Sequence, residues 1–89
     1  MPVDVAVLMY STRFCPYCMR ARALLDGKNV NYRDIGVDSH PELRREMMQK
    51  SCRRTVPQIW IGERHIGGYD DLARLEHSGE LDKLLKQVS

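Results

Sequence analysis

Two cysteines at the junction of an expected strand and an expected helix constrain the fold of this chain more than any other feature. Cys15 and Cys18 belong to a Cys-Pro-Tyr-Cys unit. Residues 5–10, an apolar run rich in strand formers, come before this unit, and a helical pattern of apolar side chains at residues 16–26 follows it. The pair therefore lies where a strand gives way to a helix.

This position gives the two thiols different chemistry. Pro16 suits the first helical position, where a missing N–H costs nothing, so Cys15 falls at the N-cap. Its sulfur can accept hydrogen bonds from the backbone N–H groups of Tyr17 and Cys18, and the helix dipole favours a thiolate there. Cys18 lies one turn further along the same face, within disulfide reach. We interpret Cys15 as an activated thiol and Cys18 as the thiol that resolves its adduct.

A structural zinc site is the alternative interpretation of the cysteine pair. Such a site needs four ligands, and the sequence has no second C-x-x-C unit. Cys52, His40, His65 and His77 lack the paired spacing of zinc ligands. A redox function is therefore favoured, and no metal is expected.

Length and composition predict one globular domain that spans residues 1–89. The chain is 43% hydrophobic and 29% charged, unlike a disordered chain, and a net charge of +2 is too small to imply nucleic acid. It has no apolar stretch of membrane-spanning length and no basic region that would begin a signal peptide. Three cysteines, an odd number, argue against a secreted disulfide framework. We expect a cytoplasmic monomer without nucleic-acid or membrane partners.

Hydrophobic patterns predict the remaining elements. The first strand (residues 5–10) and an alternating strand at 30–35 flank the first helix, which Gly27 would cap, so the two strands should be parallel. A capping box from Ser39 to Glu42 predicts a second helix that ends near Lys50. The later predicted elements are strands at 56–61 and 64–66, a helix capped by Asp70, and a final helix that carries Leu81, Leu84, Leu85 and Val88.

Three further positions have open interpretations. A cis bond before Pro57, the minority state of X-Pro bonds at about 5–6%, would free the Val56 backbone to pair with an extended peptide. Backbone N–H groups at residues 67–71 (GGYDD) could hold a carboxylate, or the segment could be a plain turn and helix cap. Cys52 is either a small apolar residue, which we favour, or an exposed thiol.

Three motifs in this order, CPYC at 15–18, TVP at 55–57 and GGYDD at 67–71, resemble the glutaredoxins, most of all the small bacterial dithiol members. The match covers about residues 5–85. The resemblance implies an α/β thioredoxin fold with a four-stranded mixed sheet flanked by helices, in the order β-α-β-α-β-β-α plus a short C-terminal helix. It also implies a cis Pro57 and glutathione as cosubstrate.

Carried over by position, the resemblance implies that Cys15 is the catalytic nucleophile and Cys18 the resolving thiol. Residues 68–70 would hold the glutamyl carboxylate of glutathione, and Arg44 with Arg54 would meet its glycyl carboxylate. The full set of implied glutathione contacts is Thr12, Arg13, Tyr17, Arg44, Arg54, Thr55, Val56, Pro57, Gly68, Tyr69 and Asp70.

The sequence departs from the family pattern at one position. Many members carry a lysine three residues before the nucleophile, where this chain has Thr12. Arg13 is adjacent, and we take it as the candidate that supplies the missing positive charge to Cys15.

The function implied by the resemblance is glutathione-dependent thiol–disulfide exchange on protein–glutathione mixed disulfides and protein disulfides. Ribonucleotide reductase is one candidate target. The alternative is an iron–sulfur carrier, in which two subunits share a cluster through Cys15 and glutathione. Pro16 counts against the carrier, because cluster-binding members usually have a small residue there.

Overall fold

The computed structural model describes residues 7–88, and the elements within this range follow the expected order. Val5 and Ala6, assigned to the first strand by the sequence, lie outside the described residues. The elements are β1 (Val7–Ser11), α1 (Pro16–Gly27), β2 (Tyr32–Gly36), α2 (Pro41–Ser51), β3 (Gln58–Ile61), β4 (Arg64–Gly67), α3 (Tyr69–Ser78) and α4 (Glu80–Val88).

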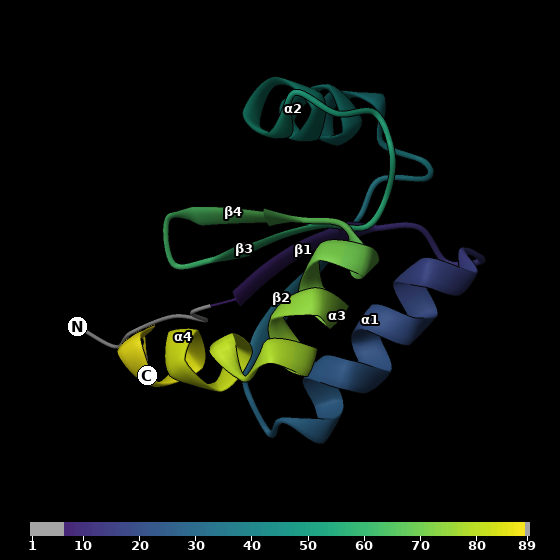
Figure 1. Cartoon of the computed structure of the whole chain (residues 1–89). Helices are drawn as coiled ribbons and strands as arrows, with labels where there is room; N and C mark the ends of the chain where they lie inside the picture. Colours follow the sequence, from purple (N-terminus) through teal and green to yellow (C-terminus); the bar gives the residue numbers. More distant parts are fainter. Residues whose placement is uncertain (1–6, 89) are drawn as a thin grey trace.

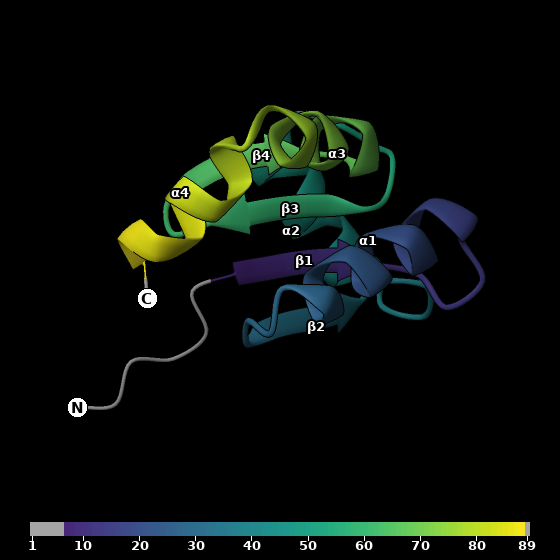
Figure 2. The same cartoon turned by 60° about the horizontal axis from the view of Figure 1, so that its bottom comes forward.

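The four strands form one mixed sheet with the order β2-β1-β3-β4, which Figure 2 shows with β2 and β4 at the two edges. β1 pairs with β2 in parallel, as the crossover through α1 requires, and it pairs with β3 antiparallel. The β3–β4 hairpin is antiparallel, also as expected. The two central strands, β1 and β3, therefore each pair with a neighbouring strand on both sides.

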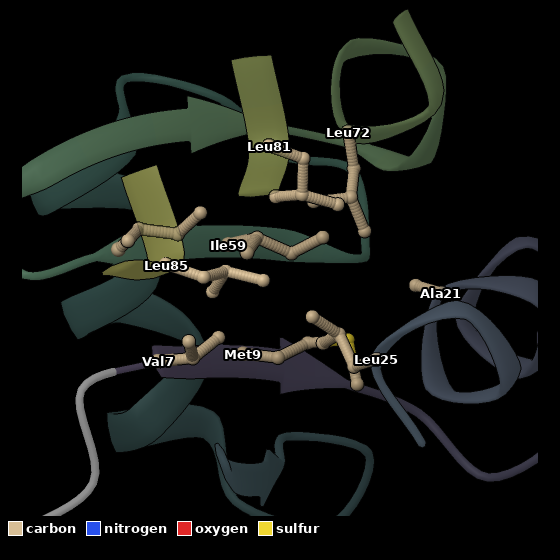
Figure 3. Packing of buried hydrophobic residues seen from close by; sticks show 9 residues of the cluster. Val7, Met9, Ala21, Leu25, Ile59, Leu72, Leu81 and Leu85 are labelled. Atoms are coloured by element: carbon tan, nitrogen blue, oxygen red, sulfur yellow. The ribbon is translucent and has the colours of Figure 1, made fainter. Parts of the chain in front are cut away.

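Helices cover both faces of this sheet. α2 lies alone over one face, while α1, α3 and α4 cover the other (Figure 1). Because successive strand residues point to opposite faces, Ile59 joins the core beneath the three helices and Trp60 joins the core beneath α2. In Figure 3 the larger core is seen from close by, with side chains from the central strands and the three helices pointing toward one another. That core comprises Val7, Met9, Ala21, Leu25, Ile59, Ile61, Leu72, Leu81 and Leu85.

Two predicted helix starts were wrong. α2 begins at Pro41, whose fixed φ suits the first helical position, so His40 is the N-cap and Ser39 lies one residue too early to cap. α3 begins at Tyr69 with Gly68 as its N-cap, which places Asp70 inside the first turn. Asp71, the third residue of that helix, is the one that reaches back and accepts from the Gly68 N–H at 3.0 Å.

The end of α1 also differs from the prediction. Gly27 is the last residue of the helix, and the left-handed residue is Asn29 with φ 56°. Asparagine tolerates this conformation because its side chain can bond locally. Between them, Lys28 reaches Glu76 at 2.5 Å and Asp82 at 2.9 Å, so this end of α1 is tied to both α3 and α4.

Cys52 is exposed, so its assignment as a small apolar residue was wrong. It caps α2 in the left-handed conformation, with φ 60° and its N–H bonded to the Met48 carbonyl at 2.9 Å. Cys52 therefore ends the helix in a left-handed backbone conformation, which is unfavourable for residues with a side chain.

We expect Cys52→Gly to raise the free energy of unfolding by up to about 1 kcal/mol, because glycine adopts a positive φ without steric cost. Urea unfolding measures the change. Cys52→Ala is the matched control, since it also removes the thiol but keeps the disfavoured backbone. Equal stability of the two variants would contradict the backbone explanation.

Within residues 7–88, the helices are all too short or too polar to cross a bilayer.

Candidate active site

The end of β1 and the start of α1 hold the two cysteines as predicted. Cys15 is the N-cap in an extended conformation, and Pro16 occupies the first helical position. The Cys18 backbone N–H points at the Cys15 sulfur, 3.4 Å away. Cys15 is partly exposed while Cys18 is completely buried, so a second molecule can reach only the first thiol directly.

The surroundings of Cys15 favour its thiolate. Burial acts to raise its pKa, but donation from the Cys18 N–H and side chain, from the Tyr17 N–H, and the positive charge of Arg22 outweigh that effect. The pKa of Cys15 therefore lies below its ordinary value. The two backbone donors are those that the sequence predicted from the helix start.

The surroundings of Cys18 favour its neutral thiol. Burial, the hydrogen bond to Cys15 and the negative charge there raise the pKa of Cys18 to about 11, against the opposing effects of the Thr12 N–H and Arg22. One thiol is thus ionised first and the other keeps its proton one turn away. This arrangement suits attack by Cys15 on a disulfide, followed by closure of Cys18 onto the resulting adduct.

We expect the two thiols to be alkylated in different pH ranges. Cys15 should react with iodoacetamide below the pH at which an ordinary thiol does, because its pKa is lowered, while Cys18 should stay protected until strongly alkaline pH. In Cys15→Ser the pKa of Cys18 should fall below that of the wild type, because the negative charge of Cys15 is gone. Mass spectrometry of each site against pH checks both statements, with Cys52→Ala as background. Equal profiles for the two thiols would contradict them.

A cleft of about 330 Å³ opens beside the cysteine pair, at the lower end of the usual size of small-molecule sites. The Val56–Pro57 peptide bond is cis, as predicted, and the Val56 carbonyl lies 3.8 Å from the Cys15 sulfur. The Tyr17 and Tyr69 rings face each other across the opening, with centroids 6.4 Å apart. The predicted residues that line the cleft are Tyr17, Thr55, Val56, Pro57, Gly68, Tyr69 and Asp70.

Two further residues line the cleft that the sequence did not single out. Arg53 and Asp71 form an ion pair at 3.1 Å, and Asp71 also accepts from the Gly68 N–H. That N–H and the Arg53 guanidinium hold the pKa of the Asp71 carboxyl below its ordinary value, although burial opposes them. A correct start for α3 would have identified Asp71 as its capping residue. Nothing in the sequence separates Arg53 from its neighbour Arg54.

The other four predicted contact residues do not line this cleft. Arg44 donates to the Arg54 carbonyl at 3.2 Å and so binds the loop after α2. Arg13, whose side chain is 73% exposed, pairs with Asp38 at 3.2 Å. Thr12 acts through its backbone, which lowers the pKa of Cys18 and whose carbonyl accepts from Arg22 at 3.1 Å. The arginine whose charge lowers the pKa of Cys15 is Arg22.

A mixed sheet of this strand order, a cysteine pair at the first helix and a cis proline beside it define a thioredoxin-like α/β protein. Comparison with known proteins narrows the class. The glutaredoxin family model matches residues 7–66. The chain belongs to the glutaredoxin family.

Individual relatives agree with this assignment. The chain is 54% identical over 79 residues to a glutaredoxin of Pseudomonas aeruginosa, which covers 89% of this chain and 94% of that protein. It is 49% identical over 80 residues to glutaredoxin 3 of Escherichia coli, covering 90% of this chain and 96% of the relative. Its structure is similar to that of a buckwheat glutaredoxin–glutathione complex, with a TM-score of 0.88 at 29% identity, covering 94% of this chain and 79% of that one.

Proposed function

We propose that this protein is a glutathione-dependent thiol–disulfide oxidoreductase, with Cys15 as nucleophile and Cys18 as resolving thiol. The observation that carries the proposal is the opposite protonation preference of two sulfurs one helical turn apart. The pKa of the partly exposed Cys15 is lowered, and that of the buried Cys18 is raised to about 11. A structural cysteine pair needs no such difference.

The proposed reaction is two successive thiolate exchanges. The Cys15 thiolate attacks the glutathione sulfur of a protein–glutathione mixed disulfide, so a new S–S bond forms and the protein leaves as a thiolate that takes up a proton. The thiolate of a second glutathione then attacks the Cys15 adduct, which releases oxidised glutathione and regenerates Cys15. Two electrons pass from two glutathione molecules to the original disulfide.

For a protein disulfide, Cys18 takes the place of the second glutathione. It loses its proton as it attacks Cys15, the mixed disulfide breaks, and the reduced substrate leaves. Two glutathione molecules then reduce the Cys15–Cys18 disulfide. Burial is the largest cause of the raised pKa of Cys18, but a disulfide at Cys15 removes the negative charge that adds to it, so Cys18 loses its proton more readily in the adduct.

The cleft beside Cys15 suits a peptide with carboxylate ends. The Val56 backbone next to Cys15 offers an edge for the cysteinyl residue of glutathione, and the start of α3 offers N–H groups for the glutamyl carboxylate. A neighbour of this fold was solved as a glutathione complex, which supports the same ligand here. The proposal includes action as a monomer in a reducing compartment such as the cytoplasm, on glutathionylated and disulfide-bonded proteins.

A coupled assay tests the function directly. Glutathione, glutathione reductase, NADPH and a glutathionylated peptide should give NADPH consumption that depends on this protein and saturates with peptide. A rate no higher than that without the protein would overturn the proposal. The visible spectrum of the purified protein tests the rival function, because an iron–sulfur carrier would be brown.

A further inference from the structure

Arg22 follows the cysteine pair on α1 and is held there by three hydrogen bonds. It is four residues after Cys18 on α1, so its side chain starts from the same helix face. Its Nε donates to Asp34 Oδ2 at 2.6 Å, and its Nη2 donates to Ser11 Oγ at 2.9 Å and to the Thr12 carbonyl at 3.1 Å. The side chain is 26% exposed, so these bonds are partly shielded from water.

The three partners come from three different segments. Asp34 is on β2, Ser11 ends β1, and Thr12 begins the loop that leads to Cys15. Ser11 Oγ also donates to the second oxygen of Asp34, which closes a ring of hydrogen bonds around the guanidinium. A planar fork with several donors can make these contacts at once, whereas an ammonium group cannot reproduce their geometry.

Thr12 connects this ring to the reactive sulfurs. Its carbonyl accepts from Arg22 Nη2 at 3.1 Å, and its backbone lies close enough to Cys18 to act on the pKa of that thiol, which it lowers. A shift of the Thr12 backbone would therefore change both the surroundings of Cys18 and the path of the loop into Cys15. The charge of Arg22 also acts on both sulfurs in the direction of the thiolate.

We propose that Arg22 is a positioning residue for the cysteine pair: the Asp34–Ser11 clamp fixes its guanidinium, which holds the Thr12 carbonyl at the start of the loop into Cys15 and keeps a positive charge near both sulfurs. The titratable groups that interact with Arg22 are Asp34 and Tyr32 on β2, Cys18 on its own helix and Cys15 at the N-cap of that helix. Asp34 neutralises part of the positive charge of Arg22. The effect on the two sulfurs therefore depends on the position of the guanidinium as well as on its charge. This role belongs to Arg22 rather than to Arg13, which is held by Asp38.

The charge of Arg22 should shift the equilibrium between the dithiol and the disulfide forms of the cysteine pair. Oxidation of the pair removes two electrons from the Cys15 thiolate and the Cys18 thiol, forms their S–S bond and releases the Cys18 proton. The two electrons, that proton and one proton from water convert oxidised glutathione to two molecules of glutathione. A cation near the sulfurs stabilises the reduced pair, because only that state carries a thiolate. Loss of Arg22 should therefore favour the disulfide and make the pair a stronger reductant.

The test compares Arg22→Gln with Arg20→Gln. Both remove one positive charge from α1, but Arg20 lies over the Tyr17 ring and makes none of these bonds. We expect Arg22→Gln to raise the Cys15 pKa and to slow its alkylation at acidic pH on the order of threefold, a size set by one partly shielded charge. It should also increase the oxidised fraction in a fixed glutathione buffer. Arg20→Gln should titrate like the wild type.

Arg22→Lys separates position from charge. If the planar guanidinium is required, lysine should recover less than half of the change in alkylation rate, whereas full recovery would overturn the positioning role. The lysine variant also provides the test if Arg22→Gln does not fold. Identical thiolate titrations for wild type and Arg22→Gln would overturn the inference altogether.

The inference rests on the proposed function in taking Cys15 as the attacking thiolate, but the titration needs no turnover. Absence of turnover together with a shifted titration would therefore refute the function and leave the role of Arg22 standing. Normal turnover with an unchanged titration would do the reverse.

Discussion

Cys15→Ser is expected to abolish turnover with every substrate, whereas Cys18→Ser should keep the deglutathionylation of a glutathionylated peptide and lose most protein-disulfide reduction. Serine keeps the shape of the N-cap but is a far weaker nucleophile, so the loss at Cys15 should be on the order of 10³-fold or more. Cys18 is not needed when glutathione itself resolves the adduct. The coupled assay with each class of substrate measures both variants.

The third thiol provides the control for this pair. Cys52 is exposed at the end of α2 and does not line the cleft, so Cys52→Ser should change neither activity by more than about twofold. A Cys18→Ser variant that is inactive with the glutathionylated peptide, while still folded, would refute the division of roles. Full protein-disulfide reduction by the same variant would refute it equally.

The sequence was sufficient for the fold because its strongest patterns are local. Apolar strands, helix-period runs and the proline after Cys15 each act over a few residues, and the structure confirms the element order, the parallel β1–β2 pair and the N-cap. The predicted start of a helix was wrong where two local sequence signals competed. At α2, Pro41 determined the first helical position over the serine–glutamate pattern that began at Ser39.

The electrostatics of the site could not be predicted in the same way. Adjacency to the family's lysine position favours Arg13, yet adjacency along an irregular loop says little about where the end of a side chain lies. Arg22 depends on Asp34, 12 residues away, which reaches it only because β2 pairs in parallel with β1. The Arg53–Asp71 pair likewise joins the loop before β3 to the start of α3.

Gly67→Ala is the second change for which we expect a large effect. Gly67 has φ +116°, a conformation that side chains rarely adopt. A Cβ there would overlap Asp71 Oδ2 and lie 2.9 Å from Arg53 Nη1. The carboxylate could move aside only by giving up both the Gly68 N–H and the Arg53 ion pair.

The expected loss of unfolding free energy is about 2–4 kcal/mol. Backbone strain contributes roughly 1–2 kcal/mol, and the bonds of Asp71 contribute the rest, less than their full value because both side chains are partly exposed. Because Gly68 and Asp71 line the cleft, glutathione affinity should fall as well. Gly79→Ala is the matched control: its φ is +85°, but no atom lies within 4 Å of the added Cβ, so only the strain remains.

A double-mutant cycle with Asp71→Ala then isolates the steric part. In the wild type, Asp71→Ala removes the carboxylate from the Gly68 N–H and from Arg53. In Gly67→Ala the carboxylate has already been displaced, so the same change should cost less there, or even stabilise the protein by making room for the new methyl group. Urea unfolding of the four proteins measures the coupling. Strictly additive losses would mean that Gly67 is required for its backbone conformation alone. The Arg53–Asp71 ion pair would then not depend on the absence of a side chain at residue 67.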